Sequence, residues 1–202
     1  MEKPAVNDHP IHDLLKNRWS PRSFSDRPVA TEDLLSLFEA ARWSPSGGNA
    51  QPWAFIVVTQ ADPEAHRNFV EILTGRNPLW AKDAPVLVLS IAKREYQPGT
   101  ANPYAYYDLG QAVAHLTMQA STLGLSVHQM GGVDKLKARA LFDIPEGYDP
   151  VTAIAIGYQG DLSALPEGLR ERELEARTRK PLTDFVFGQR WNEPLVVDMA
   201  AS

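Results

Sequence analysis

The sequence predicts a layered domain, α/β or α+β, in which helices surround roughly four strands. Short runs of consecutive apolar residues, typical of buried strands, alternate with longer segments in which apolar residues recur every three or four positions. Hydrophobic residues make up 44% of the 202 residues and charged residues 22%, which is typical of a folded domain. Because no repeat, low-complexity tract or long linker divides the chain, we expect one domain over residues 1–202.

Two helices are expected before the first strand. The first spans Asp8–Arg18 and ends before Pro21, because the residue before a proline is disfavoured in a helix. The second begins with Thr31 as its N-cap and ends at Ser44-Pro45. The first helix should place Ile11, Leu14 and Leu15 on one face, and the second should bury Leu34, Leu35, Leu37, Phe38 and Ala41.

The middle of the chain contains two apolar runs that read as buried strands, Trp53–Thr59 and Pro85–Ala92. A helix is expected between them, from Pro63 to about Thr74. The longest helix should span Tyr104–Leu123, with Gly124 placed where a C-cap belongs. Its small residues permit close packing against a neighbouring element; they are Ala105, Gly110, Ala112, Ala114 and Ala120.

The rest of the chain predicts a strand over Leu125–Met130, a helix over Asp134–Phe142 and a strand over Val151–Gly157. The last stretch, Thr183–Met199, is rich in apolar and aromatic residues, although chain ends are disordered by default. A tail of that composition needs a surface to cover.

Composition excludes several classes of function. The chain has no cysteine, which excludes disulfides, thiolate catalysis and cysteine-bound metal centres. Its net charge of −5 argues against a nucleic-acid partner. Its apolar runs are far shorter than the ~20 residues of a membrane helix, and its N-terminus has no signal-peptide pattern. We therefore expect a cytoplasmic protein with no membrane partner.

The usual signatures of catalysis are missing. The dinucleotide-binding glycine fingerprint, the Walker A loop and the G-x-S-x-G elbow are all absent. The pair His9 and His12 has no third ligand for a metal, and His115 and His128 fit hydrogen-bonded structural histidines better than general bases. The reaction centre is therefore a cofactor, or there is no reaction.

Three local features suit a cofactor. In R-W-S-P-R, residues 18, 20 and 22 alternate along a segment that Pro21 should hold extended, so two guanidinium groups and a hydroxyl share one side. The S-P-S-G-G-N-A-Q-P-W block at 44–53 places amides and flexible backbone ahead of a strand. Gly131-Gly132 follows a strand and allows close approach of a flat ligand. Each feature alone also fits an exposed helix end or a tight turn.

Together with R-T-R-K-P at 177–181, these motifs resemble the FMN-dependent nitroreductase family, in the family's order, from Ile11 to Trp191. The resemblance implies an α+β, three-layer fold with a central mixed sheet of about four strands. It implies an interlocked homodimer with FMN at the interface and residues 183–202 packed on the partner subunit. The implied activity is reduction of a nitroaromatic, a quinone or a similar small-molecule acceptor at the expense of NADH or NADPH, by ping-pong hydride transfer through the flavin.

The resemblance also assigns site residues. Arg18, Ser20, Arg177 and Arg179 match residues that hold the FMN phosphate and ribityl chain, and Arg22 matches a basic position near the pyrimidine end. Pro45, Ser46 and Asn49 match the loop that the partner chain contributes. Asn77 matches a ring contact, and Gly131 and Gly132 match the pair at the redox-active edge. The implied cofactor-binding set is Arg18, Trp19, Ser20, Arg22, Pro45, Ser46, Asn49, Gln51, Asn77, Gln129, Gly131, Gly132, Arg177 and Arg179. Substrate-side candidates are Tyr104, Tyr106 and Tyr107. No metal ligand and no catalytic side chain are implied, apart from the Gly131 backbone near the redox-active edge.

The chain departs from the family pattern in two places. Gly131 stands where many members carry an acidic residue, which affects the charge near the ring. The helical insert that covers the site in some members has only Lys93–Tyr107 to correspond to it. Three alternatives stay open at this point: a relative of the same fold that performs reductive dehalogenation or flavin degradation, a non-catalytic flavin or small-ligand binder, and a protein-interaction domain.

Overall fold

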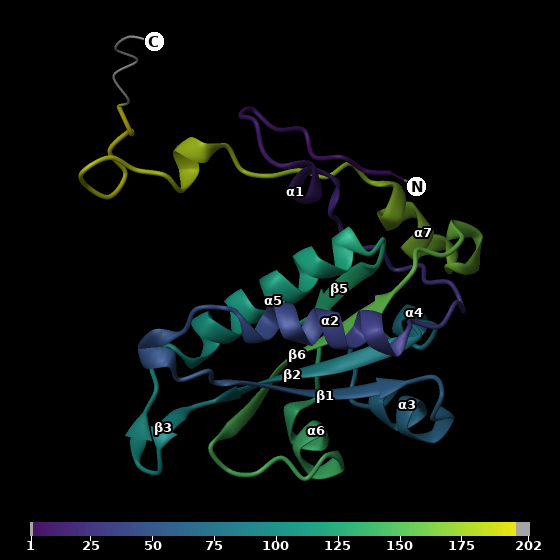
Figure 1. The fold of residues 1–202 in the computed structure, drawn as a ribbon. Coiled ribbons are helices and arrows are strands. Elements are labelled where there is room, and N and C mark those ends of the chain that lie inside the picture. The colour runs from purple at the N-terminus through teal and green to yellow at the C-terminus, as the bar shows by residue number, and fades with distance from the viewer. Residues whose placement is uncertain (1, 197–202) are drawn as a thin grey trace.

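A single antiparallel sheet forms the centre of the molecule in the computed structural model, which describes residues 2–196 (Figure 1). The strand order is β1-β2-β6-β5, with β1 at Trp53–Thr59, β2 at Val86–Lys93, β6 at Tyr148–Gly157 and β5 at Ser126–Met130. All three strand pairs are antiparallel, so the expectation of a mixed sheet is wrong for the described residues. Strands β2 and β5 are not adjacent in the sheet, because β6 lies between them.

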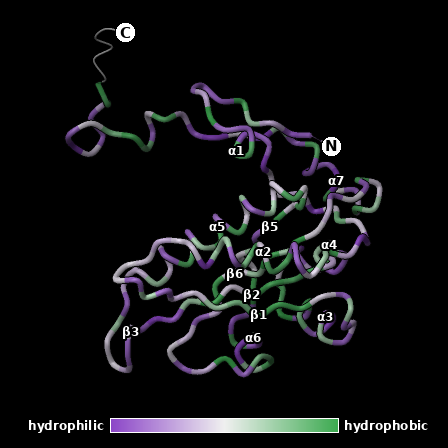
Figure 2. Tube along the Cα trace, viewed as in Figure 1, coloured by the Kyte–Doolittle hydropathy of each residue, from purple (hydrophilic) through white to green (hydrophobic). Residues whose placement is uncertain are grey.

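Helices cover both faces of the sheet, which confirms the α+β class and its three layers (Figure 1). On one face α2 (Thr31–Arg42) packs beside α5 (Ala105–Thr122). On the other lie α3 (Pro63–Val70), α4 (Pro78–Ala81) and α6 (Lys135–Leu141). Strand β2 is buried on both faces, and its residues alternate between the two hydrophobic cores. Figure 2 shows this concentration of hydrophobic residues along the sheet.

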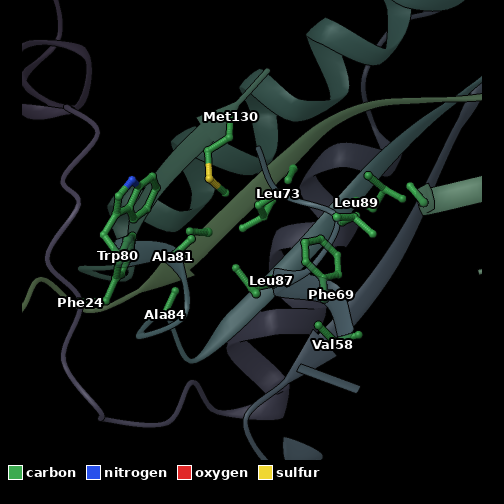
Figure 3. Close-up of a cluster of buried hydrophobic side chains, with 14 of the residues drawn as sticks. Phe24, Val58, Phe69, Leu73, Trp80, Ala81, Ala84, Leu87, Leu89 and Met130 are labelled. Carbon is green, nitrogen blue, oxygen red and sulfur yellow. The ribbon is translucent and has the colours of Figure 1, made fainter. Parts of the chain in front are cut away.

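The core on the α3 face connects three parts of the chain that matter below. Trp80 of α4 is 1% exposed and stacks on Phe24 with ring centroids 6.2 Å apart (Figure 3). The other neighbour of Trp80 is the His128 ring on β5, at 4.5 Å. Burying an aromatic side chain of this size contributes about 1.5–3 kcal/mol. The core therefore fixes the segment before Phe24 relative to β5.

Several predicted elements are shorter than expected. Helix α1 spans only Asp13–Asn17, because His12 caps it and Ile11 and Leu15 are 44% and 50% exposed, so a longer helix would bury little. Helix α3 ends at Val70, well before Thr74, since the backbone of Leu73 instead bridges to Val133.

Helix α2 differs from the prediction in two details. Its N-cap is Ala30, which offers no side-chain hydrogen bond, and Thr31 is the first helical residue. Leu35 is 63% exposed, because it lies off the stripe formed by the other apolar positions of the helix.

Four features were not expected from the sequence, and α4 is one of them. The segment Lys93–Tyr107 holds no helical lid; it contains a small hairpin of β3 (Glu95–Gln97) and β4 (Thr100–Ala101) before α5 begins. A further helix, α7, spans Glu167–Leu174. Short 3-10 turns, η1 at Gly47–Asn49, η2 at Leu162–Ala164 and η3 at Leu182–Asp184, complete the described elements. No helix in residues 2–196 is long and apolar enough to cross a membrane.

The two ends of the chain run beside each other. After α7 the chain passes α1 and the N-terminal segment, and the C-terminal arm, residues 181–196, then projects away from the body (Figure 1). Its tip is a tight turn in which Phe187 bridges to Pro194.

Candidate functional site

Three arginines from opposite ends of the sequence converge beside α1. We call Arg18, Arg177 and Arg179 the arginine cluster. Burial, and then the charges of Arg177 and Arg179, lower the pKa of Arg18; burial and the charge of Arg179 likewise lower the pKa of Arg177. Arg18 Nη1 donates to the hydroxyl of Ser20 at 3.2 Å. Cations held together in this way repel one another, and an anion such as a phosphate would relieve the repulsion.

Backbone carbonyl groups hold the cluster together. Arg177 Nη1 donates to the carbonyl oxygens of Lys3 and of Lys16, the latter at 2.9 Å. Lys3 Nζ donates in return to the carbonyl oxygens of Glu173, at 2.6 Å, and Glu175. These hydrogen bonds join the N-terminal segment to the segment that follows α7, and they position Arg177 and Arg179 beside Arg18.

Arg22 has a different environment from the other basic residues of the predicted site. Its guanidinium Nη1 lies 3.0 Å from Glu173 Oε2, and its backbone N–H donates to Glu173 Oε1 at 2.6 Å. Glu173 is only 1% exposed. Arg18 and Arg22 line two different cavities, so the expected row of three side chains on one side is wrong for Arg22. A role for Arg22 at a cofactor stays a prediction.

His128 joins this segment to the edge strand β5. Its Nδ1–H donates to the carbonyl oxygen of Pro21 at 2.9 Å. Burial lowers the pKa of His128 to about 4, so the ring is neutral near pH 7. Two other histidines named from the sequence also make structural contacts: His115 Nδ1 lies 2.7 Å from Ser44 Oγ, and His12 caps α1. No group of three potential metal ligands occurs among residues 2–196.

The end of β5 presents exposed backbone next to the α3–α4 turn. A Cβ atom on Gly131 would meet no atom within 4 Å, whereas one on Gly132 would lie 2.7 Å from Asn77 Nδ2. Asn77 Nδ2 donates to the Gly132 carbonyl at a long 3.5 Å. The exposed side chain of Gln129 reaches toward Thr117 on α5, with Nε2 at 3.4 Å from Oγ1. Gly132 is therefore needed for packing, while Gly131 faces open space.

The loop of residues 44–51 has a strained backbone, and we call it the left-handed loop. Gly48, Asn49 and Gln51 have φ angles of 58°, 56° and 47°. Left-handed conformations at non-glycine residues cost about 1–3 kcal/mol each and cluster at ligand-binding sites. Ser46 Oγ accepts the Gln51 N–H at 3.0 Å, which helps to hold the loop in shape.

The left-handed loop packs against the start of α5. A cavity of about 260 Å³ lies between them, lined by Pro45, Ser46, Gly47, Tyr104, Tyr107, Asp108 and Gln111. Tyr104 and Tyr107 are 55% and 71% exposed. Tyr106 points elsewhere, because its hydroxyl donates to the Asp149 carboxylate, and this hydrogen bond raises the pKa of Tyr106. The expected cluster of three tyrosines is therefore reduced to two at this cavity.

The arginine cluster and the left-handed loop lie at opposite ends of α5 (Figure 1). Arg18 lines a cavity of about 390 Å³ together with Ser121 and Gly124, at the C-terminal end of that helix. The 18 residues of α5 span about 27 Å at 1.5 Å per residue. Side chains do not bridge such a distance, so within one chain the two groups do not form a single compact site.

Two buried carboxylates were missed from the sequence. Glu173 lies in a run of charges, R-E-R-E-L-E-A-R, that reads as a solvated helix face. Asp108, 2% exposed, was the better signal, because it is an isolated charge in the otherwise apolar first half of a long helix. Its Oδ2 accepts the Gly47 N–H at 3.1 Å.

Comparisons with known proteins agree with this arrangement. The sequence profile of the nitroreductase family matches residues 15–158. A solved structure described as an oxidoreductase containing FMN superposes with a TM-score of 0.87 at 38% identity, over 93% of this chain and 96% of that one. A putative NADH dehydrogenase/NAD(P)H nitroreductase of Archaeoglobus fulgidus is 30% identical over 73% of this chain and 84% of its own length. An FMN reductase (NAD(P)H) of Bacillus subtilis is 30% identical over 74% of this chain and 66% of its own length. The chain belongs to the nitroreductase family.

Proposed function

We propose that this chain is a homodimeric, FMN-dependent NAD(P)H oxidoreductase that reduces nitroaromatic, quinone or similar acceptors by a ping-pong mechanism. The observation that carries the proposal is the arginine cluster, in which Arg18, Arg177 and Arg179 crowd together beside the Ser20 hydroxyl. The names of relatives that contain FMN or use NAD(P)H support the identity of the anion and the electron donor.

The described residues fit FMN at both ends. The arginine cluster and Ser20 would hold the phosphate and ribityl chain, since arginine grips phosphate with two parallel hydrogen bonds. The backbone at Gly131 faces open space, where a flat ring would approach closely, and its N–H would be a donor for the ring. When bound, FMN would supply the redox chemistry that connects NAD(P)H to the acceptor.

The side chains near the site position ligands and leave proton supply to water. His128 has its Nδ1–H engaged by Pro21 and is held neutral, so it is a structural group. Tyr106 is engaged by Asp149. Tyr104 and Tyr107 are exposed beside the left-handed loop, and we assign them to acceptor choice. This arrangement asks the protein for orientation and electrostatics, with no side-chain nucleophile.

A second chain completes the site in this proposal. Because the left-handed loop and the arginine cluster lie at opposite ends of α5, each FMN would take its phosphate contacts from one chain and its loop from the partner. The C-terminal arm supports the dimer, since Phe185, Trp191 and Val196 are 58%, 81% and 82% exposed. We propose that residues 183–202 pack on the partner; Val197 and the residues after it lie outside the described part. Truncation after Lys180 should therefore yield a monomer or an insoluble chain without FMN.

Anaerobic titration of the FMN-loaded protein tests the proposed function. We expect NADH or NADPH to bleach the flavin absorbance, and a quinone or nitroaromatic acceptor to restore it. A yellow protein that neither donor bleaches would be a flavin binder without turnover, and a protein that ignores added FMN would contradict the proposal outright. Including a halogenated aromatic among the acceptors tests the dehalogenase alternative in the same experiment.

A further inference from the structure

Asp108 is a buried carboxylate that the proposed chemistry does not use. It is 2% exposed, lies in the first turn of α5 and accepts the backbone N–H of Gly47 through Oδ2 at 3.1 Å. A carboxylate is costly to bury, and a hydrogen bond to a charged group is roughly twice as strong as a neutral one. The hydrogen bond to Gly47 therefore links α5 firmly to the left-handed loop.

The loop needs such an anchor because its own conformation is unfavourable. Two non-glycine residues in it, Asn49 and Gln51, have left-handed backbone, and strain of this kind persists only where surrounding contacts impose it. Gly47 also packs on the Tyr104 ring, where a Cβ atom would lie 3.3 Å from Cδ2. One turn after Tyr104, Asp108 fixes the same residue from its backbone side.

We propose that Asp108 is a positioning residue that holds the left-handed loop in its ligand-ready shape for the FMN of the partner subunit. The inference rests on the proposed function for the identity of the ligand, and on the Gly47 hydrogen bond for the shape of the loop. Its carboxylate acts through the loop, because Oδ2 is engaged by the Gly47 N–H.

Amide hydrogen exchange and FMN affinity, measured on the dimeric full-length chain, test the proposal. In Asp108→Ala, exchange at residues 46–51 should become about tenfold faster or more, and FMN should bind about tenfold more weakly. In Asp108→Asn, both effects should be smaller but present, since the amide oxygen still accepts a neutral hydrogen bond. If Asp108→Ala does not fold, the Asn variant alone decides the question.

The matched control is Asp62→Ala. Asp62 caps α3 by accepting the N–H groups of Glu64 and Ala65, and it follows β1, at the opposite end of that strand from the left-handed loop. We expect this variant to lower thermal stability while leaving FMN affinity and exchange at residues 46–51 at the wild-type values. A purely structural role for Asp108 would make the two alanine variants alike at equal loss of stability.

Failure of the Asp108 proposal can be distinguished from failure of the proposed function. Wild-type exchange rates at residues 46–51 and wild-type FMN affinity in both Asp108 variants would overturn the role of Asp108 and leave the proposed function intact. A wild-type protein that binds no FMN would overturn the proposed function, while the exchange rates would still decide whether Asp108 holds the loop.

Discussion

The arginine cluster and the left-handed loop are assembled in opposite ways. The cluster gathers like charges from the two ends of the chain and is held by hydrogen bonds to backbone carbonyl groups of Lys3 and Lys16. The loop is one continuous segment, and its strain is stored in the backbone of residues 48–51. The positive charge of the cluster suits a negatively charged group, and the fixed backbone of the loop suits a ligand surface of a particular shape. A flavin nucleotide offers a charged phosphate at one end and a flat ring at the other, which matches this division.

Gly131→Val should have the largest effect on the bound flavin, because it blocks the space for the ring and alters neither the arginine cluster nor the left-handed loop. A Cβ atom at Gly131 meets no protein atom within 4 Å, so the fold should tolerate a side chain there, but that side chain would occupy the space assigned to the cofactor. We expect FMN binding or hydride transfer to be abolished, as measured by flavin absorbance of the purified protein and by anaerobic reduction with NAD(P)H. Gly131→Ala serves as the milder control. Normal flavin reduction in Gly131→Val would contradict the placement of the ring at this end of β5.

Acid should lower the stability of the folded chain through His128, which links the arginine side of the site to β5. The folded pKa of His128, about 4, lies below the unfolded value of 6.5, so the unfolded chain binds a proton that the folded chain does not. This contribution to stability is fully present above pH 6.5 and is lost as the pH falls through 4. The full loss is about 3 kcal/mol.

Urea unfolding between pH 7 and pH 4 measures this loss. In His128→Gln the decline over that range should flatten, because the titrating group is gone. An equally steep decline in that variant would assign the acid sensitivity to other groups.

Arg18→Ala tests the charge side of the comparison directly. A hydrogen bond to a charged group contributes about 1.5–3 kcal/mol, so FMN should bind about tenfold to a hundredfold more weakly. Removing Arg179 should give a loss of the same order. Because the arginines of the cluster repel one another, each variant should be at least as thermally stable as the wild type when FMN is absent. Unchanged FMN affinity, measured by fluorescence titration, would contradict the assignment.

Tyr104→Phe and Tyr107→Phe should give the smallest effects. If water supplies the protons, flavin reoxidation in single turnover should stay within about tenfold of wild type, with shifts in KM and acceptor preference. A catalytic acid would contribute about 10²–10⁴-fold. Tyr106→Phe is the matched control, because its hydroxyl is engaged by Asp149 away from the cavity. A thousandfold slower reoxidation in either test variant, with FMN still bound, would identify a true proton donor.

Elements with a long, regular apolar pattern could be predicted from the sequence. Strand β1 has the predicted bounds, and α5 begins and ends one residue inside them, because burial fixes such segments independently of the rest. Helix α1 and the C-terminal arm could not be placed in this way, since their apolar residues stay exposed in one chain. The pairing of Arg22 with Glu173 joins residues 151 positions apart, and no local pattern encodes it.

The site shows the same limit. The glycines of the loop and of β5 are visible in the sequence as breaks in the pattern, so the region was predictable. The left-handed backbone at Asn49 and Gln51 was not, since it is imposed by contacts such as that of Asp108 with Gly47. The convergence of the two basic segments could be predicted only from the family resemblance, because only the tertiary structure brings Lys3, Lys16 and Arg177 together.

The central claim, that each FMN takes its phosphate contacts from one chain and its loop from the other, is tested most directly by a hybrid dimer. One chain carries Arg18→Glu, and the other carries Gly48→Val, which forces a β-branched residue into a φ of 58°. Each variant homodimer should bind FMN weakly at both sites. The hybrid, purified through two different tags, should contain one damaged site and one intact site, and so bind one FMN per dimer with wild-type affinity. A hybrid with no site of wild-type affinity would show that both regions serve the same chain, and would contradict the account.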